Sequence, residues 1–182
     1  MSCRIYLLRH GIAGPTPAGM GDGDRRLTPE GERKMHQIAL GLKRLGIVPD
    51  VVLSSPLQRA EETAAAVAAV LAPELAIETY PPLAPGNAVT DVLAGLRQYR
   101  RARHLMLVGH QPDLGHLASH LLTGSATLMM LPFRKGSAAA IQVSALPPHT
   151  AGTLQWLLAP KQLRMIGRRA RGRCRGLNPT GK

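Results

Sequence analysis

The chain has 182 residues, of which 45% are hydrophobic and 19% charged, a composition that excludes collagen and wholesale disorder and predicts a globular protein with a proper core. Lys and Arg number 23 against 11 Asp and Glu, which gives a net charge of +12. No apolar run approaches the roughly 20 residues that cross a bilayer, so we expect a soluble protein without a membrane partner.

The two cysteines, Cys3 and Cys174, lie near opposite ends of the chain and lack the spacing of a metal site. Nothing at the N-terminus resembles a signal peptide. These features together predict a cytoplasmic protein with reduced thiols.

The positive charge is concentrated toward the C-terminus. No carboxylate follows Asp113, and residues 114–182 carry ten Lys and Arg, whereas residues 1–113 carry 13 against 11 acidic residues. We expect a single domain over residues 1–166 and a basic, disordered tail over residues 167–182. The tail is interpreted as a solvated segment, with nonspecific binding of nucleic acid or another polyanion as the alternative.

The first predicted elements are a strand, a loop and a helix. The apolar run Arg4–Leu8 predicts a buried strand, and a loop rich in Gly and Pro follows as far as Arg26. Thr28-Pro29-Glu30 predicts the start of a helix, with Thr28 as the N-cap and proline at the first helical position. Gly46 ends this helix. The residues expected on its inward face are Met35, Ile38, Ala39, Leu42 and Leu45.

Strands and helices continue to alternate after Gly46. The further strands are predicted over Val51–Leu53, Ile77–Tyr80, His104–Val108, Ala138–Val143 and Leu154–Leu158, and the further helices over Leu57–Leu71, Val89–Arg100 and Leu114–Leu122. This alternation predicts an α/β fold, a three-layer α/β/α sandwich with a mostly parallel central sheet. In such a sheet the ligand site lies beyond the carboxyl ends of the strands.

Two of the predicted strands end in a histidine, in Arg9-His10-Gly11 and in Gly109-His110. Because the carboxyl ends of parallel strands meet at one edge of the sheet, we expect His10 and His110 to lie close together. Arg59, in the first turn of the helix after the second strand, reaches the same edge. Arg9 and Arg59 can each donate two hydrogen bonds to phosphate oxygens, and the helix N-terminus adds backbone donors. The sequence therefore predicts a cationic pocket that binds anions.

The same residues carry a resemblance to a known family. Arg9-His10-Gly11 at the end of the first strand resembles the hallmark of the histidine phosphatase (phosphoglycerate mutase-like) superfamily. Three more stretches are similar in the same order: Leu27-Thr28-Pro29-Glu30-Gly31, Ser55-Pro56-Leu57-Gln58-Arg59-Ala60 and Gly109-His110-Gln111-Pro112. The short chain, Leu83-Ala84-Pro85-Gly86 and the stretch from Trp156 to Leu163 resemble most the small phosphohistidine phosphatases of the SixA type. The resemblance implies a phosphoglycerate mutase-like fold without a large insertion capping the pocket.

The resemblance also implies roles for individual residues. His10 is expected to attack phosphorus and to carry a transient phosphoryl group, while Arg9, Arg59 and His110 bind the phosphoryl oxygens. Gly11 and Arg25 are expected to contribute to substrate binding, Arg25 from the rim. A nucleophilic imidazole needs an acceptor for its other ring nitrogen, such as a backbone carbonyl in the Gly11 turn. Covalent catalysis of this kind implies neither a metal nor another cofactor.

One departure from the family pattern concerns the leaving group. Many members supply a Glu or Asp after the third strand as general acid, but this stretch reads Pro81-Pro82-Leu83. A phosphorylated imidazole leaves more readily than an alkoxide, so the departure favours phosphohistidine on a protein, of the histidine-phosphotransfer domain type, as substrate. A phosphatase of a small phosphate ester remains the alternative, and so does a non-catalytic module that recognises phosphate and attracts nucleic acid with its tail.

Overall fold

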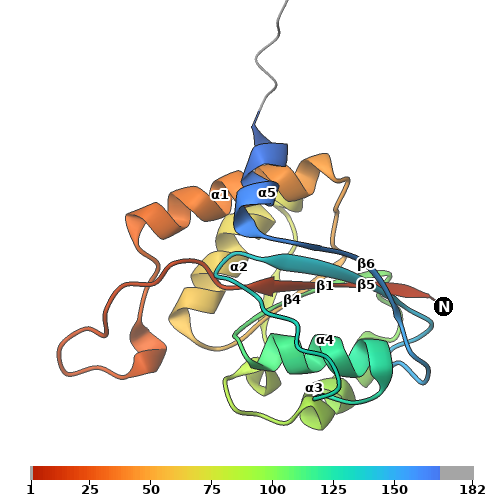
Figure 1. The fold of residues 1–182 in the computed structure, drawn as a ribbon. Coiled ribbons are helices and arrows are strands. Elements are labelled where there is room, and N and C mark those ends of the chain that lie inside the picture. The colour runs from red at the N-terminus through yellow and green to blue at the C-terminus, as the bar shows by residue number, and fades with distance from the viewer. Residues whose placement is uncertain (1, 169–182) are drawn as a thin grey trace, which may run out of the picture.

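The computed structural model describes residues 2–168, which form a six-stranded sheet with helices on both faces (Figure 1). The strands are β1 (Cys3–Arg9), β2 (Val51–Ser54), β3 (Ile77–Thr79), β4 (His104–Gly109), β5 (Ala138–Val143) and β6 (Thr153–Leu158). The helices are α1 (Pro29–Arg44), α2 (Gln58–Leu71), α3 (Val89–Gly95), α4 (Asp113–Thr123) and α5 (Pro160–Gly167). The predicted start of the tail at residue 167 is wrong, because Gly167 is the buried last residue of α5. Residues 169–182 lie outside the described residues, so the disorder of this basic segment stays a prediction.

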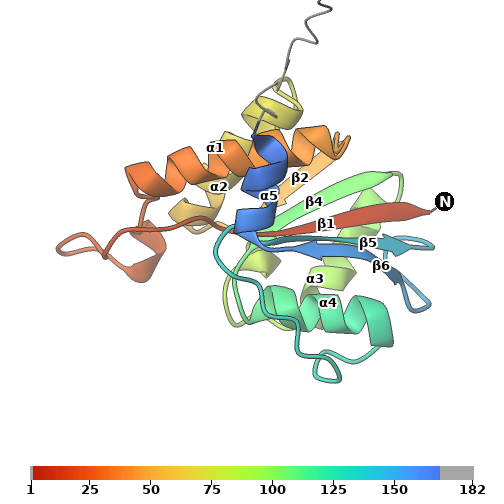
Figure 2. The same ribbon diagram turned by 45° about the horizontal axis from the view of Figure 1, so that its top comes forward.

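The strand order in the sheet is β3-β2-β4-β1-β5-β6. The pairs formed by β3, β2, β4 and β1 are parallel, and β5 and β6 add to the edge in antiparallel orientation. Helices α1, α2 and α5 cover one face, and α3 and α4 cover the other (Figure 2). The predicted three-layer sandwich with a mostly parallel sheet is thereby confirmed. The segment between β3 and α3 contains only the short 3-10 turn Pro81–Leu83.

Both faces of the central strands are buried. In β1, Ile5 and Leu7 pack in the apolar cluster that contains residues of α3 and α4, whereas Tyr6 and Leu8 pack in the cluster on the side of α1 and α2. Alternating side chains of a strand point to opposite faces, so each central strand contributes to two cores. This burial explains why the central strands appear in the sequence as continuous apolar runs. No helix among residues 2–168 is long and apolar enough to cross a membrane.

Helix α1 begins as predicted, because the Thr28 hydroxyl accepts a hydrogen bond from the amide of Gly31 at 2.9 Å and Pro29 follows it. The prediction that Leu45 faces inward is wrong. The helix ends at Arg44, and Leu45 is the C-cap with 41% of its surface exposed. The chain turns at Gly46, whose φ of +74° is a conformation that favours glycine.

The predicted helix Val89–Arg100 is also shorter than expected. Helix α3 ends at Gly95 and continues as a 3-10 turn over Leu96–Tyr99. The Tyr80 hydroxyl donates a hydrogen bond to the carbonyl oxygen of Val92 at 2.7 Å and lies where a Cβ on Gly95 would be placed. The Tyr80 hydroxyl thus takes the place of the backbone amide that would donate to the Val92 carbonyl if the α-helix continued.

Helix α5 was not predicted from the sequence. It packs on α1 (Figure 1), where Leu163 is fully buried and the Arg44 side chain donates a hydrogen bond to the carbonyl oxygen of Ile166 at 2.7 Å. Gly41 permits this close approach, since a Cβ on Gly41 would collide with the backbone carbonyl of Leu163. The packing of α5 on α1 therefore depends on a missing side chain.

We expect Gly41→Ala to lower the free energy of unfolding by about 2 kcal/mol, because the backbone of α5 must move to make room. Gly23→Ala is the control, since a Cβ at exposed Gly23 meets nothing within 4 Å, and its effect should stay within about 0.5 kcal/mol. Urea unfolding followed by circular dichroism measures both. Equal stability of the two variants would show that α1 and α5 do not pack as closely as described.

Candidate active site

The pairing of β1 with β4 brings the two predicted histidines together. Arg9 is the register partner of Gly109, and the amide of His10 donates a hydrogen bond to the carbonyl oxygen of Gly109 at 3.1 Å. The ring centroids of His10 and His110 are 5.0 Å apart, and only 6% and 3% of the two residues are exposed. The expectation that the strand ends place both side chains at one edge of the sheet is met.

His10 is held by the turn that follows it. Its Nδ1 lies 2.8 Å from the carbonyl oxygen of Gly11, which is the acceptor expected in this turn. The amide of Gly11 in turn donates to the hydroxyl of Thr63 at 3.0 Å, and a Cβ on Gly11 would lie 2.8 Å from Cγ of Met35. Since a carbonyl only accepts, Nδ1 carries the proton and Nε2 keeps its lone pair.

Burial keeps both imidazoles neutral. Desolvation lowers the pKa of His10 to about 3, against which its hydrogen bond to Gly11 acts in the opposite direction. Desolvation, followed by the positive charges of Arg59 and Arg9, lowers the pKa of His110 to about 4. His110 is therefore a neutral hydrogen-bonding group at neutral pH.

The ring of His110 is held by Ser55, a residue for which the sequence predicted no role. Nε2 of His110 lies 2.8 Å from the Ser55 hydroxyl, which also accepts from the amide of Leu57 at 3.4 Å. The Ser55 hydroxyl has one proton and two lone pairs, so it either donates to Nε2 or accepts from it; where it donates, the neutral ring carries its proton on Nδ1. That Nδ1 is buried and has no partner among the described residues. In the tautomer with the proton on Nδ1, this nitrogen is available to donate a hydrogen bond to a bound anion.

Three arginines surround the histidine pair. Arg9 donates to the carbonyl oxygen of Phe133 at 2.6 Å, and its Nε is buried without a partner in the described part of the chain. Arg59, 6% exposed, donates to Oδ2 of Asp22 at 2.9 Å and to the backbone oxygen of Asp22 at 2.7 Å. Arg25 donates to Oδ1 of Asp22 at 3.0 Å and to Gly14 at 2.8 Å.

Asp22 is the functional candidate that sequence reasoning missed. The hydrogen bond from Arg25, together with that from Arg59, holds the pKa of its carboxyl below the ordinary value. The carboxylate is therefore charged at neutral pH and occupies donors of Arg59 that the sequence analysis assigned to a phosphoryl group. Asp22 lies in a loop rich in Gly and Asp, three residues before Arg25. A loop has no helical or strand periodicity from which the position of a side chain could be predicted.

The side chains line one cleft of about 230 Å³. The predicted Arg9, His10, Arg25, Arg59 and His110 all border it, and Gly11 lies in the turn behind His10. The unpredicted lining residues are Asp22, Pro85, Gln111 and Lys135. Within residues 2–168, no three His, Cys, Asp or Glu side chains form a group that could hold a metal ion. The cleft is cationic, with one carboxylate in its lining.

Known proteins share both the sequence and the fold. The family model of the histidine phosphatase superfamily (branch 1) matches residues 5–84. An uncharacterized protein of Picosynechococcus sp. is 37% identical over 164 residues, which cover 87% of this chain and 98% of the relative. The phosphohistidine phosphatase SixA of Escherichia coli (strain K12) is 29% identical over 164 residues, 89% of this chain and 97% of that protein.

The solved structure of the protein histidine phosphatase SixA complexed with tungstate superposes with a TM-score of 0.77 at 27% identity, covering 88% of this chain and 99% of that chain. The likeness extends along nearly the whole of that structure. It agrees with the absence of a large insertion between β3 and α3 in this chain.

The two depressed pKa values predict how stability depends on pH. Because His10 and His110 resist protonation when folded but not when unfolded, the unfolded chain binds more protons below pH 6.5. The free energy of unfolding should therefore fall as the pH is lowered from 7 to 5, by at most about 1.4 kcal/mol per pH unit for each histidine. In His10→Gln/His110→Gln this dependence should be nearly absent, as urea unfolding at several pH values would show. Parallel curves for both proteins would contradict the described burial.

The contact between Asp22 and Arg59 leads to a prediction about phosphate affinity. Asp22→Asn removes a negative charge that competes with anions for Arg59, so the affinity for orthophosphate should rise about fivefold at low ionic strength. Asp24→Asn is the matched control, because Asp24 lies in the same turn and accepts only from the amide of Gly21. Isothermal titration calorimetry measures both. Weaker phosphate binding by Asp22→Asn would show instead that Asp22 is needed to hold Arg59 in place.

Proposed function

The chain belongs to the histidine phosphatase superfamily, and we propose that it is a metal-independent phosphatase that removes the phosphoryl group from phosphohistidine on a protein. The observation that carries this proposal is the state of His10, a neutral and buried imidazole whose Nδ1 is bound to the Gly11 carbonyl beside three arginines. We further propose that the partner is a phosphorylated histidine-phosphotransfer domain and that the reaction takes place in the cytoplasm.

The first step is transfer of the phosphoryl group to His10. Nε2 attacks phosphorus with its lone pair while the bond between phosphorus and the substrate nitrogen breaks. The Gly11 carbonyl accepts a hydrogen bond from Nδ1 and so stabilises the positive charge that develops on the ring. Arg9, Arg59 and Nδ1 of His110 stabilise the phosphoryl oxygens, because these donors are already oriented before the reaction.

The leaving group decides between the substrate classes. A phosphorylated imidazole that is protonated on its other nitrogen departs as a neutral imidazole, so the bond breaks without an acid. An alkoxide needs a proton at that moment. Among the described residues the only carboxylate that lines the cleft is Asp22, and its lowered pKa makes it a poor proton donor. The cleft therefore favours phosphohistidine over small phosphate esters.

The second step regenerates the enzyme. Water attacks the phosphorus of phosphorylated His10, the bond to Nε2 breaks, and inorganic phosphate leaves the cleft. Asp22 and Arg25 lie at the rim, where Asp22 accepts hydrogen bonds from both Arg59 and Arg25.

The experiment compares wild type with His10→Ala on a phosphorylated histidine-phosphotransfer domain in the presence of a metal chelator. Wild type should release phosphate and His10→Ala should lose about a thousandfold or more in kcat, because the nucleophile is gone. His36→Ala is the control, since His36 is exposed on α1 away from the cleft. Rapid quenching with labelled substrate should trap phosphate on His10 in a form that is stable to alkali and labile to acid.

Three outcomes would contradict the proposal. Equal activity of wild type and His10→Ala means that His10 is not the nucleophile. Turnover of sugar phosphates but not of the phosphoprotein assigns the chain to small phosphate esters. Activity that disappears with the chelator and returns with added metal contradicts the metal-independent route.

A further inference from the structure

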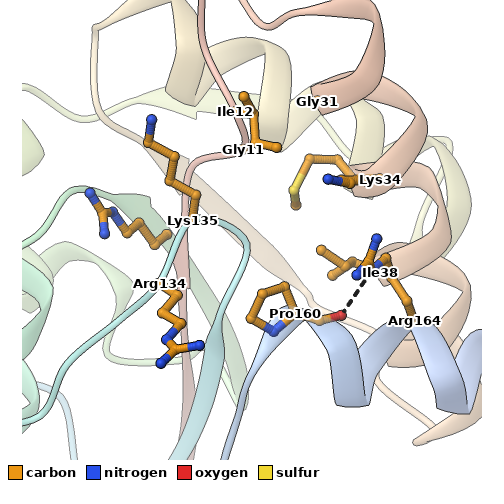
Figure 3. Close-up of a pocket in the computed structure, with 11 residues that line it drawn as sticks. Gly11, Ile12, Gly31, Lys34, Ile38, Arg134, Lys135, Pro160 and Arg164 are labelled. Atoms are coloured by element: carbon orange, nitrogen blue, oxygen red, sulfur yellow. Dashed lines mark hydrogen bonds between the residues drawn. The ribbon is translucent and has the colours of Figure 1, made fainter.

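A second cavity lies directly beside the candidate active site. Figure 3 shows residues that line it. The cavity has a volume of about 410 Å³ and shares Arg9 and Lys135 with the cleft of the candidate active site. Its other walls come from the turn after β1, from α1 and from the start of α5. A volume of this size accommodates a few side chains or a small ligand. The mechanism proposed above uses only Arg9 and the Gly11 turn among its lining residues.

The floor of the second cavity is apolar and fixed in shape. Met35, Ile38 and Pro160 lie together there, and Ile12 closes one side. A Cβ on Gly136, whose φ is +80°, would lie 2.7 Å from Cδ1 of Ile38 and 3.4 Å from Sδ of Met35. The chain passes this floor only because glycine has no side chain. The floor is therefore a preformed surface for an apolar group.

The rim is positively charged on opposite sides. Figure 3 shows Lys34 and Arg164 on one side of the cavity and Lys135 on the other. Exposed Glu30 pairs with Nζ of Lys34 at 2.6 Å, but it does not line the cavity. In the described part of the chain, neither Lys135 nor Arg164 forms an ion pair, and no carboxylate is among the lining residues.

Lys135 is held at the boundary between the two cavities by a tight turn. The amide of Ser137 donates to the carbonyl oxygen of Arg134 at 2.7 Å, and the amide of Arg134 donates to the hydroxyl of Ser137 at 3.0 Å. The amide of Gly136 lies 3.1 Å from the carbonyl oxygens of Arg9 and His10. The backbone that carries Lys135 is thus bonded to the backbone of the nucleophile.

We propose that the second cavity binds an acidic segment of the phosphoprotein substrate, with an apolar side chain on the Met35 floor and flanking carboxylates on Lys34, Lys135 and Arg164. The proposal rests on the proposed function, because it names the part of the same substrate that surrounds the phosphohistidine. Charge complementarity favours an acidic occupant, and the apolar floor favours one with a hydrophobic side chain between the acids. The shared Arg9 and Lys135 make the two sites continuous.

The kinetic test changes the rim without changing the cleft. Lys34→Gln/Arg164→Gln should raise KM for a phosphorylated histidine-phosphotransfer domain about tenfold and leave kcat unchanged, since two charge pairs with the substrate are lost. Turnover of phosphoramidate, which is too small to reach the cavity, should not change. The control is Arg33→Gln/Lys161→Gln, which removes the same charge from exposed positions of the same two helices that do not line the cavity. An equal rise of KM in both variants, or slower turnover of phosphoramidate, overturns the proposal.

A binding test separates this proposal from the proposed function. In the full chain labelled with carbon-13 at the methionine methyl groups, the peptide Glu-Glu-Leu-Glu-Glu should shift the NMR signal of Met35, and Lys-Lys-Leu-Lys-Lys should not. The shift should disappear in Lys34→Gln/Arg164→Gln and persist in the control variant. An acidic peptide that binds to a protein without phosphohistidine phosphatase activity contradicts the proposed function alone. Phosphatase activity without a Met35 shift, or a shift produced equally by citrate, overturns the peptide site alone.

Discussion

The candidate active site depends on the parallel pairing of Arg9 with Gly109. This register gives the amide of His10 the Gly109 carbonyl as its partner and leaves His10 and His110 as the first residues beyond two neighbouring strands. A slip of one residue would turn one histidine to the other face of the sheet. The two cores oppose such a slip, because Leu7 and Leu8 are fully buried on opposite faces and the slip would exchange them. Apolar packing thus holds the geometry of the candidate site.

The charges that gather at this edge do not stabilise the free protein. Arg9 and Arg59 repel each other, and Nε of Arg9 and Nδ1 of His110 are buried without a partner in the described residues. A buried donor without an acceptor costs about 1 to 3 kcal/mol. A phosphoryl group provides acceptors for these donors and negative charge for the arginines. Only part of this deficit is offset in the free protein, by the carboxylate of Asp22. The site is therefore organised for an anion before one arrives.

The parts of this arrangement that follow from local pattern could be predicted from the sequence. The layers follow from the alternation of strands and helices. The proximity of His10 and His110 requires only that two apolar strands be parallel neighbours and that each be followed by a histidine. The position of Asp22 could not be predicted, because its partner Arg59 is 37 residues away and the loop between them has no period. The contact between Nε2 of His110 and the Ser55 hydroxyl likewise joins residues that lie 55 positions apart in the chain. Helix α5 did have a local signal, because Pro160 stands at its first position. The helix is short, however, and it leads into the basic segment that was interpreted as a disordered tail.

Under the proposed function, specificity for one phosphoprotein has to come from residues beside the cleft, because no segment of the described chain covers it. The segment between β3 and α3 is too short to form a cap, so the chemistry of the leaving group is the first filter. That filter separates an imidazole from an alkoxide, but it does not distinguish one phosphohistidine from another. The second distinction requires contacts with residues that flank the phosphohistidine, and the turn that carries Lys135 joins such a surface to the backbone of His10. Because binding energy there does not change along the reaction, it selects the partner without altering the chemical step.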